Sequence, residues 1–267
     1  VAAGTNHTAP ASAVCTATVS LPSKTLADND PATIQAVGAA GTGASYWAVG
    51  DKIGIAVNGT FGGLTLNQTV YAFILGFNHN SSVEGGNSIH FQFGKTAAGV
   101  DIAFVNSYGS TSTGFCMNTS NTNSGGWKNS HMMKTICPAF LNALPSAWRN
   151  AIKNCTKYSD NTGGGNDTAS YVTATTQKIF LLAEFEVHGT RYYANSAEKN
   201  YQKQYDYYKN GNSKVKYQHT ATTSACFWWL RSVYASNTNN FCRVYTDGSA
   251  SSYSAYNSHG FAPGFDI

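Results

Sequence analysis

Charged side chains are scarce in this chain of 267 residues, since Asp, Glu, Lys and Arg together make up only 11% of it. An average soluble protein has about 25%. The net charge is +4 and no basic run occurs, which argues against a nucleic-acid-binding groove. Low charge combined with 13% aromatic residues also argues against a charge-driven disordered chain. No apolar run reaches the roughly 18 residues that a membrane-spanning helix needs, so we expect no membrane insertion.

Recognisable catalytic and metal-binding motifs are also absent. The six cysteines are scattered and none form a Cys-x-x-Cys pair, which excludes a zinc ribbon or a redox motif of that type. We expect mostly buried, unpaired thiols, Cys137 and Cys242 among them. The chain lacks His-Glu-x-x-His, Gly-x-Ser-x-Gly and the EF-hand spacing. We therefore predict no enzyme activity, no catalytic residue, no cofactor and no metal.

The role of one cluster of titratable residues depends on whether it forms a strand or a helix. Glu184, Glu186 and His188 follow an apolar stretch. On a strand the three would share one face and could bind a metal, whereas on a helix the two carboxylates would diverge. We predict a structural polar cluster that hydrogen-bonds neighbouring loops and binds no transition metal.

The distribution of apolar residues and turn residues predicts a mixed fold. Residues 1–27 are rich in Ala, Thr and Ser and indicate a linker or an extended arm, followed by one domain over residues 28–267. The patterns that predict regular structure are listed from the N-terminus: a helix over 31–37 ending at Gly38, strands at 53–57, 69–77, 89–93 and 102–105, a helix over 131–141 kinked or restarted at Pro138, a helix over 145–153, a strand at 178–182 and a helix over 196–209. Because strands and helices are segregated, the pattern favours an α+β fold with antiparallel sheet.

The last 36 residues, 232–267, contain no Lys, Glu, Gln, Met or Trp. These are the five amino acids that no codon ending in a pyrimidine can specify. Asn, Ser, Tyr and Thr make up 17 of the 28 residues in segment 232–259. Mutagenesis of adenines in a template rich in Asn codons would leave this composition, whereas the alternative is a polar surface loop depleted by chance.

Several motifs of the chain resemble a known family. Trp228-Trp229-Leu230-Arg231-Ser232, Phe241-Cys242-Arg243-Val244, Asp247-Gly248 and Gly260-Phe261-Ala262-Pro263-Gly264-Phe265 resemble the C-terminal frame of an uncharacterised domain family of gut phages and bacteria. Residues 125–130 and 180–189 resemble it as well. That family is similar to the variable target proteins of diversity-generating retroelements. The chain departs from many relatives at Val233, where they have proline.

The resemblance implies a C-type-lectin-like fold with antiparallel sheet, a few short helices and long loops. It also implies a ligand-binding, receptor-recognition protein with a hypervariable segment 232–259. Its ligand would be a host or cell-surface protein or glycan. The protein would be displayed on a virion or a bacterial surface. It would form a homo-oligomer or be attached to a larger particle through the N-terminal arm. The Glu-Pro-Asn and Trp-Asn-Asp motifs of calcium-dependent lectins are absent, so a calcium-bridged sugar site is not expected.

Side chains between the frame residues are the candidates for ligand contact, because Tyr, Ser and Asn dominate antibody loops and Tyr and Arg are frequent hot spots. They are Tyr234, Asn237, Asn239, Arg243, Tyr245, Ser252, Tyr253, Tyr256, Ser258 and His259. Strand alternation places Phe241, Arg243 and Tyr245 on one face, with Arg243 and Tyr245 pointing outward, and Cys242 and Val244 in the core.

The frame itself is expected to be scaffold. Trp228 and Trp229 would anchor a sheet, and a buried indole N–H would need a partner. Arg231 would stack on an aromatic ring or pair with a carboxylate such as Asp266. Asp247-Gly248 predicts a hairpin turn.

Two alternatives remain open at this point. The first is a structural tail or decoration protein without diversified binding. The second is an enzyme on a fold like that of sulfatase-modifying factors, which would need a reactive cysteine pair. Cys226 and Cys242 are the only C-terminal candidates for such a pair.

Overall fold

A computed structural model describes residues 21–267. Most of the predicted linker or extended arm, residues 1–27, therefore lies outside the described residues. Of its last residues, Leu26 is buried in the core. The carbonyl of Ser23 accepts a 3.0 Å hydrogen bond from the indole N–H of Trp47. The folded unit thus includes residues that precede position 28.

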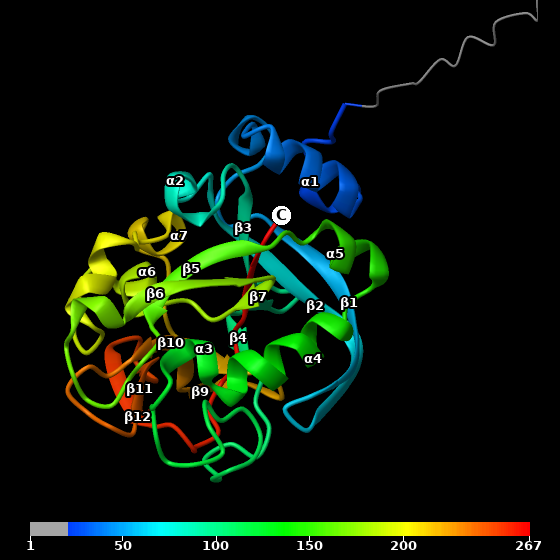
Figure 1. The fold of residues 1–267 in the computed structure, drawn as a ribbon. Helices are drawn as coiled ribbons and strands as arrows, with labels where there is room; N and C mark the ends of the chain where they lie inside the picture. The colour runs from blue at the N-terminus through cyan, green and yellow to red at the C-terminus, as the bar shows by residue number, and fades with distance from the viewer. Residues whose placement is uncertain (1–20) are drawn as a thin grey trace, which may run out of the picture.

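A five-stranded sheet runs through the middle of the fold, with strand order β1-β2-β3-β13-β7 and antiparallel pairing (Figure 1). Its strands are β1 (Lys52–Phe61), β2 (Leu64–Phe77), β3 (Ile89–Lys95), β13 (Gly264–Asp266) and β7 (Ile179–Phe180). In β1, Ile53, Ile55 and Val57 are buried and alternate with exposed residues, as expected for a strand with one face on the core. Gly62 and Gly63 connect β1 to β2 with φ of 54° and 74°, as a two-residue hairpin turn requires.

The C-terminal strand β13 lies between β3 and β7, so the chain ends in the middle of this sheet (Figure 1). The N–H of Ile89 donates to the carbonyl of Ile267 at 2.9 Å. Helix α1 (Pro31–Ala39) approaches the same carbonyl so closely that a Cβ on Gly38 would lie 2.4 Å from the oxygen. The prediction that α1 stops at Gly38 is therefore wrong: this glycine permits a close contact, and the helix continues to Ala39.

Three smaller sheets complete the β structure in the described part of the chain. They have the orders β4-β8-β9, β5-β6 and β10-β11-β12, with strands β4 (Ile102–Ala103), β8 (Lys216–Gln218), β9 (Ala221–Cys226), β5 (Cys155–Asp160), β6 (Val172–Gln177), β10 (Trp228–Val233), β11 (Asn240–Val244) and β12 (Ala250–Ser254). Their pairings are antiparallel except for β4 with β8. The strands of the β10-β11-β12 sheet and the loops that connect them contain most of segment 232–259, and this sheet lies at the periphery, away from the C-terminus (Figure 1).

The helices are short. Besides α1 they are η1 (Leu26–Asp28), η2 (Gly43–Ser45), α2 (Ser81–Glu84), α3 (Gly126–Asn129), the π-helical turn η3 (Met132–Ile136), α4 (Cys137–Asn142), α5 (Ser146–Ala151), η4 (Ala169–Tyr171), α6 (Glu184–His188), η5 (Ser196–Asn200) and α7 (Asp206–Lys209). Asp30 caps α1 by accepting a 2.8 Å hydrogen bond from the N–H of Thr33, as its Asp-Pro start predicts.

Two of the longer predicted helices are interrupted. The helix over 131–141 restarts near Pro138, which lies in the first turn of α4 directly after η3, as expected for a residue without an N–H. The prediction of one helix over 196–209 is wrong, because only η5 and α7 are helical in this stretch. Tyr205 there is fully buried, and its N–H donates to the carbonyl of Glu186. This tertiary contact replaces the helical hydrogen bond.

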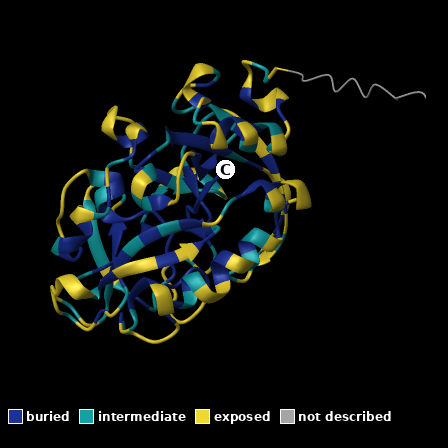
Figure 2. Cartoon of the chain, turned by 45° about the horizontal axis from the view of Figure 1, so that its top comes forward, coloured by how far each residue is buried: buried dark blue, intermediate teal, exposed yellow. Residues whose placement is uncertain are grey.

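Strands β3 and β10 are buried throughout, whereas many exposed residues lie on helices and loops (Figure 2). The five rings of Phe61, Phe93, Phe104, Phe140 and Phe261 form one buried group, with contacting ring centroids 4.9–6.3 Å apart. Edge-to-face pairs such as Phe61 with Phe140 are favourable for aromatic rings.

The structure confirms the predicted mixture of α and β elements, with mostly antiparallel sheets and short helices. None of the helices among residues 21–267 is long and apolar enough to cross a membrane.

Arg231 on β10 connects three parts of the core. Its Nη1 and Nη2 atoms each lie 2.5 Å from an oxygen of Glu186 on α6. Nη1 also donates to the carbonyl of Leu181 at 2.9 Å, and Nε donates to the hydroxyl of Ser159 on β5 at 2.8 Å. All four residues are buried. This guanidinium therefore fixes β10 against α6 and the β5-β6 hairpin.

The prediction that Arg231 pairs with a carboxylate is confirmed, but the partner is Glu186 and not the suggested Asp266. Asp266 lies instead with its Oδ1 2.7 Å from Nδ1 of His90, because β13 pairs with β3. Burial alone would raise the pKa of Glu186, but the charge of Arg231 lowers it to about 2. Burial would also lower the pKa of Arg231, and the carboxylate raises it above its usual value. The two charges thus stabilise each other.

Replacement of Arg231 by Met should lower the free energy of unfolding by about 3–5 kcal/mol, because it leaves the Glu186 carboxylate buried without a partner. The double variant Arg231→Met/Glu186→Leu should recover much of this loss, since neither charge of this pair then remains buried without its partner. Urea denaturation of the wild type and both variants measures the two effects. A single variant as stable as the wild type would contradict this account of the ion pair.

Candidate functional site

The C-terminal sheet brings residues of three strands to one face. Its register pairs Trp229 with Arg243, Arg243 with Ser251, and Phe241 with Tyr253. Residues directly opposite each other in antiparallel strands share a face, as do alternate residues of one strand. These five residues therefore lie on one side of the sheet, which is termed the Arg243 face.

Aromatic rings surround the guanidinium of Arg243. Its central carbon lies 3.8 Å from the ring centroid of Phe227 and 4.2 Å from that of Tyr253. The Tyr245 ring centroid is 5.7 Å away. Cations over aromatic faces at such distances gain electrostatic attraction from the ring. The rings hold the plane of the guanidinium in one orientation.

The Arg243 guanidinium makes few polar contacts with the protein. Nη1 lies 2.9 Å from Nε2 of His259, and Nε donates to the hydroxyl of Ser251 at 3.2 Å. Burial and the neighbouring Arg243 charge lower the pKa of His259 to about 3, so its ring is neutral and accepts through Nε2. Burial lowers the pKa of Arg243 to about 10. No carboxylate among the described residues pairs with this cation.

The predicted ligand-binding residues differ in exposure. Tyr245 and Tyr253 are 41% and 43% exposed, and they are two of only four large hydrophobic side chains that are exposed in residues 21–267. Five more of the predicted residues are half-buried, namely Tyr234, Asn237, Asn239, Ser252 and Tyr256. Arg243, Ser258 and His259 are buried.

The prediction that Arg243 points outward into solvent is wrong. The side chain is only 5% exposed, because aromatic rings cover it. Phe241, on the same face, is fully buried as well. The prediction of Cys242 and Val244 in the core is confirmed. Ser252 pairs with Cys242 and so belongs to the opposite face of the sheet from Arg243.

Two further predicted contact residues are parts of the scaffold. The hydroxyl of Ser258 donates to the carbonyl of Asn106 at 2.6 Å and accepts from the N–H of Phe115 at 2.9 Å. His259 packs against the ring of Trp229, with ring centroids 4.7 Å apart. Neither side chain reaches the surface, so the prediction that Ser258 and His259 contact a ligand directly is wrong. Both side chains instead support neighbouring residues of the scaffold.

The frame tryptophans belong to the core that supports the Arg243 face. Trp228 and Trp229 are fully buried. Their indole N–H groups donate to the carbonyls of Lys214 at 2.9 Å and Phe115 at 2.8 Å. Each therefore has the polar partner that a buried indole needs. The predicted hairpin turn at Asp247-Gly248 is present between β11 and β12, with φ of 87° at Gly248.

Asn123 holds the loop that connects β10 to β11. It is fully buried. Its side-chain amide donates to the carbonyls of Asn237 and Asn240 at 2.6 and 3.0 Å, and its N–H donates to the carbonyl of Thr238 at 2.9 Å. Its Oδ1 accepts from the N–H of Gly164. Sequence analysis missed Asn123, because it lies in an Asn- and Ser-rich stretch where nothing distinguishes it.

The segment after β12 is also held mainly by its backbone. The carbonyls of Ala255, Tyr256 and Ser258 accept from the N–H groups of Asn118, Ser112 and Gly109. These bonds, like those of Asn123, do not depend on which side chains occupy the segment. Asn237 is an exception, since its Oδ1 accepts from the N–H groups of Asn239 and Asn240 and shapes its own loop.

Glu184, Glu186 and His188 lie on helix α6, so the alternative in which a strand brings them to one face is wrong. The carboxylate of Glu184 accepts from the N–H groups of residues 192–194 at 2.8–3.0 Å. Glu186 is occupied by Arg231. Burial lowers the pKa of His188 to about 4. The hydrogen bonds assign both carboxylates a structural role.

Glu198 supports Ser232 at the start of segment 232–259. It is fully buried, and its Oε2 accepts from the hydroxyl of Ser232 at 2.6 Å and from the amide of Gln202 at 2.9 Å. Its Oε1 accepts from the N–H of Asp160 at 2.9 Å. Burial outweighs these bonds and raises the pKa of Glu198 to about 7.

A buried set of possible metal ligands lies elsewhere in the fold. One donor atom each of Glu84, His90 and Asp266 lies within 4.8 Å of the others. However, the ammonium of Lys157 lies 2.5 Å from Glu84 Oε2 and 3.9 Å from Asp266 Oδ2. The lysine supplies the positive charge that a metal would bring, so a metal ion would have to displace it.

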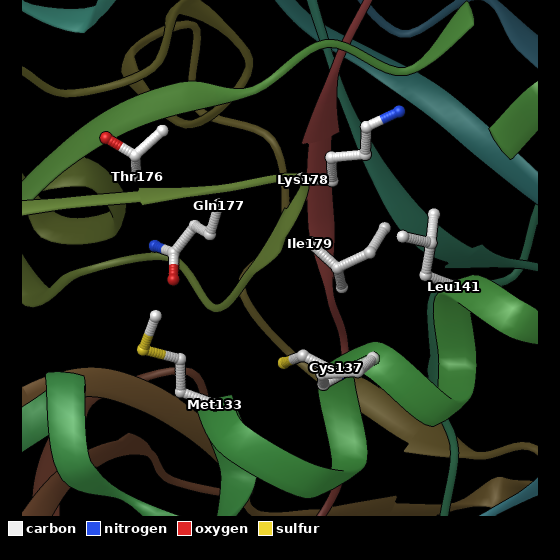
Figure 3. Close-up of a pocket in the computed structure, with 8 residues that line it drawn as sticks. Met133, Cys137, Leu141, Thr176, Gln177, Lys178 and Ile179 are labelled. Atoms are coloured by element: carbon white, nitrogen blue, oxygen red, sulfur yellow. The ribbon is translucent and has the colours of Figure 1, made fainter. Parts of the chain in front are cut away.

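A pocket of about 250 Å³ opens between η3–α4 and the β6–β7 segment (Figure 3). Its lining is mainly apolar, and Met133, Cys137 and Leu141 lie on its helical side opposite Gln177 and Ile179. Burial raises the pKa of the Cys137 thiol, which is the opposite of what a nucleophilic thiol needs. The pocket is therefore a mainly apolar cavity without a nucleophilic thiol.

The thiols match their prediction. Cys116, Cys137, Cys155, Cys226 and Cys242 are buried and free, which confirms the predicted state of Cys137 and Cys242; Cys15 lies outside the described residues. Burial raises the pKa of Cys226 to about 12 and also raises that of Cys242. Reactive cysteines are accessible and have a lowered pKa. The pair that the enzyme alternative needs lacks both properties.

The chain was compared with known proteins. Residues 109–267, or 159 of 267, match the model of a family described as "Domain of unknown function (DUF6273)". The matched region contains the Arg243 face, Asn123 and Arg231. No curated protein and no solved structure matches the chain.

Glu198 should make the stability of the fold depend on pH. Its pKa is raised from 4.5 to about 7, so its contribution is present below pH 4.5 and is lost as the pH rises through about 7. We expect the unfolding free energy of the wild type, relative to the isosteric variant Glu198→Gln, to fall by up to about 3 kcal/mol across this window. Urea denaturation between pH 4.5 and 8 measures the difference. A pH-independent difference would show that Glu198 has no raised pKa.

The variant Asn123→Ala should release the β10–β11 loop. It leaves several main-chain groups without a partner, which costs about 1–3 kcal/mol for each group that stays buried. Hydrogen exchange should become faster at the amides of Asn239 and Asn240. The control is Asn121→Ala, since Asn121 is a nearby exposed residue of the same type. Equal exchange in both variants would contradict the role of Asn123.

Proposed function

The chain belongs to the DUF6273 family, and we propose that it is a ligand-binding protein that recognises a host or cell-surface molecule through its C-terminal face. The proposal includes a C-type-lectin-like fold and display on a phage particle or a bacterial surface. The observation that carries it is the pair of exposed tyrosines, Tyr245 and Tyr253, beside the Arg243 guanidinium.

Exposed aromatic side chains support a binding surface. A tyrosine ring supplies a large amphipathic contact area at low entropic cost, which is why Tyr is frequent in antibody loops and at interface hot spots. Tyr245 packs on Phe227 with ring centroids 4.7 Å apart, and Tyr253 packs on Arg243. Both rings are therefore oriented before a ligand arrives, which reduces the entropy lost on binding.

The way the variable segment is held supports its proposed diversification by adenine mutagenesis. Main-chain carbonyls of residues 234–240 and 255–258 receive the hydrogen bonds that fix these loops. The loops can keep their course while their side chains change. Residues 232–267 contain no Lys, Glu, Gln, Met or Trp, the five amino acids without pyrimidine-ending codons. This composition also supports the proposed adenine mutagenesis.

The structure narrows the proposed contact set. Tyr245 and Tyr253 are its centre, and Tyr234, Asn239 and Tyr256 are half-buried and available at their exposed atoms. Asn237, Ser258 and His259 act through the scaffold, and Ser252 lies on the opposite face. Arg243 lies beside the two tyrosines. A near-copy of the final coding segment, differing only at adenines and lying beside a reverse-transcriptase gene, would support diversification; without one, the structural decoration protein becomes the better proposal.

Tyr245→Ser/Tyr253→Ser should abolish binding and leave the fold nearly intact. Exposed side chains change stability by about 0.5 kcal/mol, and loss of a cation–π contact adds about 0.5–1 kcal/mol. Trp229→Ala, as the contrast, should cost about 3–5 kcal/mol because the indole is fully buried. Extending the change to Tyr234 and Tyr256, both only half-buried, should add little to the loss of stability.

Thermal melts measure stability, and flow cytometry with labelled protein on a panel of intact bacterial cells measures binding. A double Tyr variant that melts as early as Trp229→Ala would place these tyrosines in the core. A double variant that still binds cells would move the site away from the Arg243 face.

A further inference from the structure

Arg243 differs from the other buried cations of the described chain. Lys95, Lys157, Lys216 and Arg231 are buried, and each has a nitrogen within 3.9 Å of a carboxylate oxygen. Arg243 is 5% exposed and has no such partner among the described residues. A buried charge without a counter-ion is costly, and Arg is seldom buried unless it is paired. The missing anion has to come from outside this part of the chain.

The geometry selects the kind of anion. Phe227 and Tyr253 cover the guanidinium plane, so a partner must approach its edge. Nε and Nη1 each have one protein partner, whereas Nη2 makes no hydrogen bond with the described residues. A guanidinium edge matches a planar carboxylate in a bidentate pair. The adjacent His259 is neutral, and the ionisable groups that act on Arg243 are the tyrosines Tyr108, Tyr245 and Tyr253, so a single negative charge fits better than a phosphate dianion.

The surroundings favour a sugar over a protein as the carrier of the carboxylate. Among residues 21–267, the only exposed aliphatic side chain of large size is Leu21, which lies in the N-terminal part of the chain. The apolar core of a protein interface usually combines aromatic and aliphatic side chains, whereas the exposed large side chains of the Arg243 face among the described residues are aromatic alone. The Arg243 face instead presents two tyrosine rings, with Ser251 beside the guanidinium. Flat rings bordered by hydroxyl groups suit a polyhydroxylated ring.

We propose that the Arg243 face binds an acidic sugar, of the sialic-acid or uronic-acid type, by pairing its carboxylate with the free edge of the Arg243 guanidinium while Tyr245 and Tyr253 contact the sugar ring. This inference rests on the proposed function and names its ligand class. It requires no calcium ion.

The probes are free N-acetylneuraminic acid and glucuronic acid, each compared with its uncharged methyl ester. Binding to the wild-type protein is followed by chemical-shift titration. At least one acid should bind, and its ester should bind about 10- to 100-fold more weakly, because a hydrogen bond to a charged group is lost. This comparison needs no variant and therefore does not depend on folding.

Two variants assign the effect to the side chain. Arg243→Gln removes the charge and should weaken acid binding about 10- to 100-fold while leaving ester binding nearly unchanged. Arg243→Lys keeps the charge but loses the planar edge, so its affinity for the acid should also fall. Both variants are used only if their thermal melts show a folded protein. Ser252→Ala, on the opposite face of the sheet, is the control and should bind as the wild type does.

The outcomes separate this proposal from the proposed function. Equal binding of acid and ester, or acid binding that Arg243→Gln leaves intact, overturns the carboxylate pairing. If neither acid binds but labelled protein binds cells through Tyr245 and Tyr253, the acidic-sugar class is wrong and the ligand-binding function stands. If the cell ligand proves to be a protein bound at Arg243, the sugar assignment is likewise overturned.

Discussion

The buried ion pair between Arg231 and Glu186 is the constraint on which the rest of the structure depends. It joins the first strand of the C-terminal sheet to helix α6, and further hydrogen bonds of the same guanidinium reach Leu181 and β5. Two charges removed from water require excellent geometry to be stable, so the elements that supply their partners have little freedom to move. Segment 232–259 follows Arg231 directly, so its first residue is held in a fixed position.

The protein uses its two buried arginines in different ways. Arg231 has a full set of acceptors within the chain and serves the fold. Arg243 lies on the next strand of the same sheet, directly opposite Trp229, and is contacted by aromatic rings, one hydroxyl and a neutral histidine, but by no anion among the described residues. The first charge is neutralised internally, and the second has no counter-ion among the described residues. If the proposed binding function is correct, one small sheet thus separates stability from recognition.

Backbone hydrogen bonds would make the proposed diversification compatible with a stable fold. Asn123 and the loop over residues 109–118 bind main-chain groups of segment 232–259. Main-chain groups are the same whatever the side chain, so substitutions at Tyr245 or Tyr253 leave these bonds in place. Positions such as Asn237 and Ser258, whose side chains bond the backbone, belong to the frame although they lie among the variable residues.

Local signals in the sequence predicted β1, β2, β3 and β7 of the central sheet, the Asp30 cap and the Asp247-Gly248 turn, because alternation, capping and turn chemistry act over a few residues. They did not indicate β13. They also located the segment that contains Tyr245 and Tyr253. Only the tertiary structure decided that Arg231 pairs with Glu186, that Arg243 lies under aromatic rings, and that Asn123 holds a loop more than 100 residues away. These contacts join segments distant in sequence, and burial of a polar side chain depends on what covers it, which no local pattern encodes.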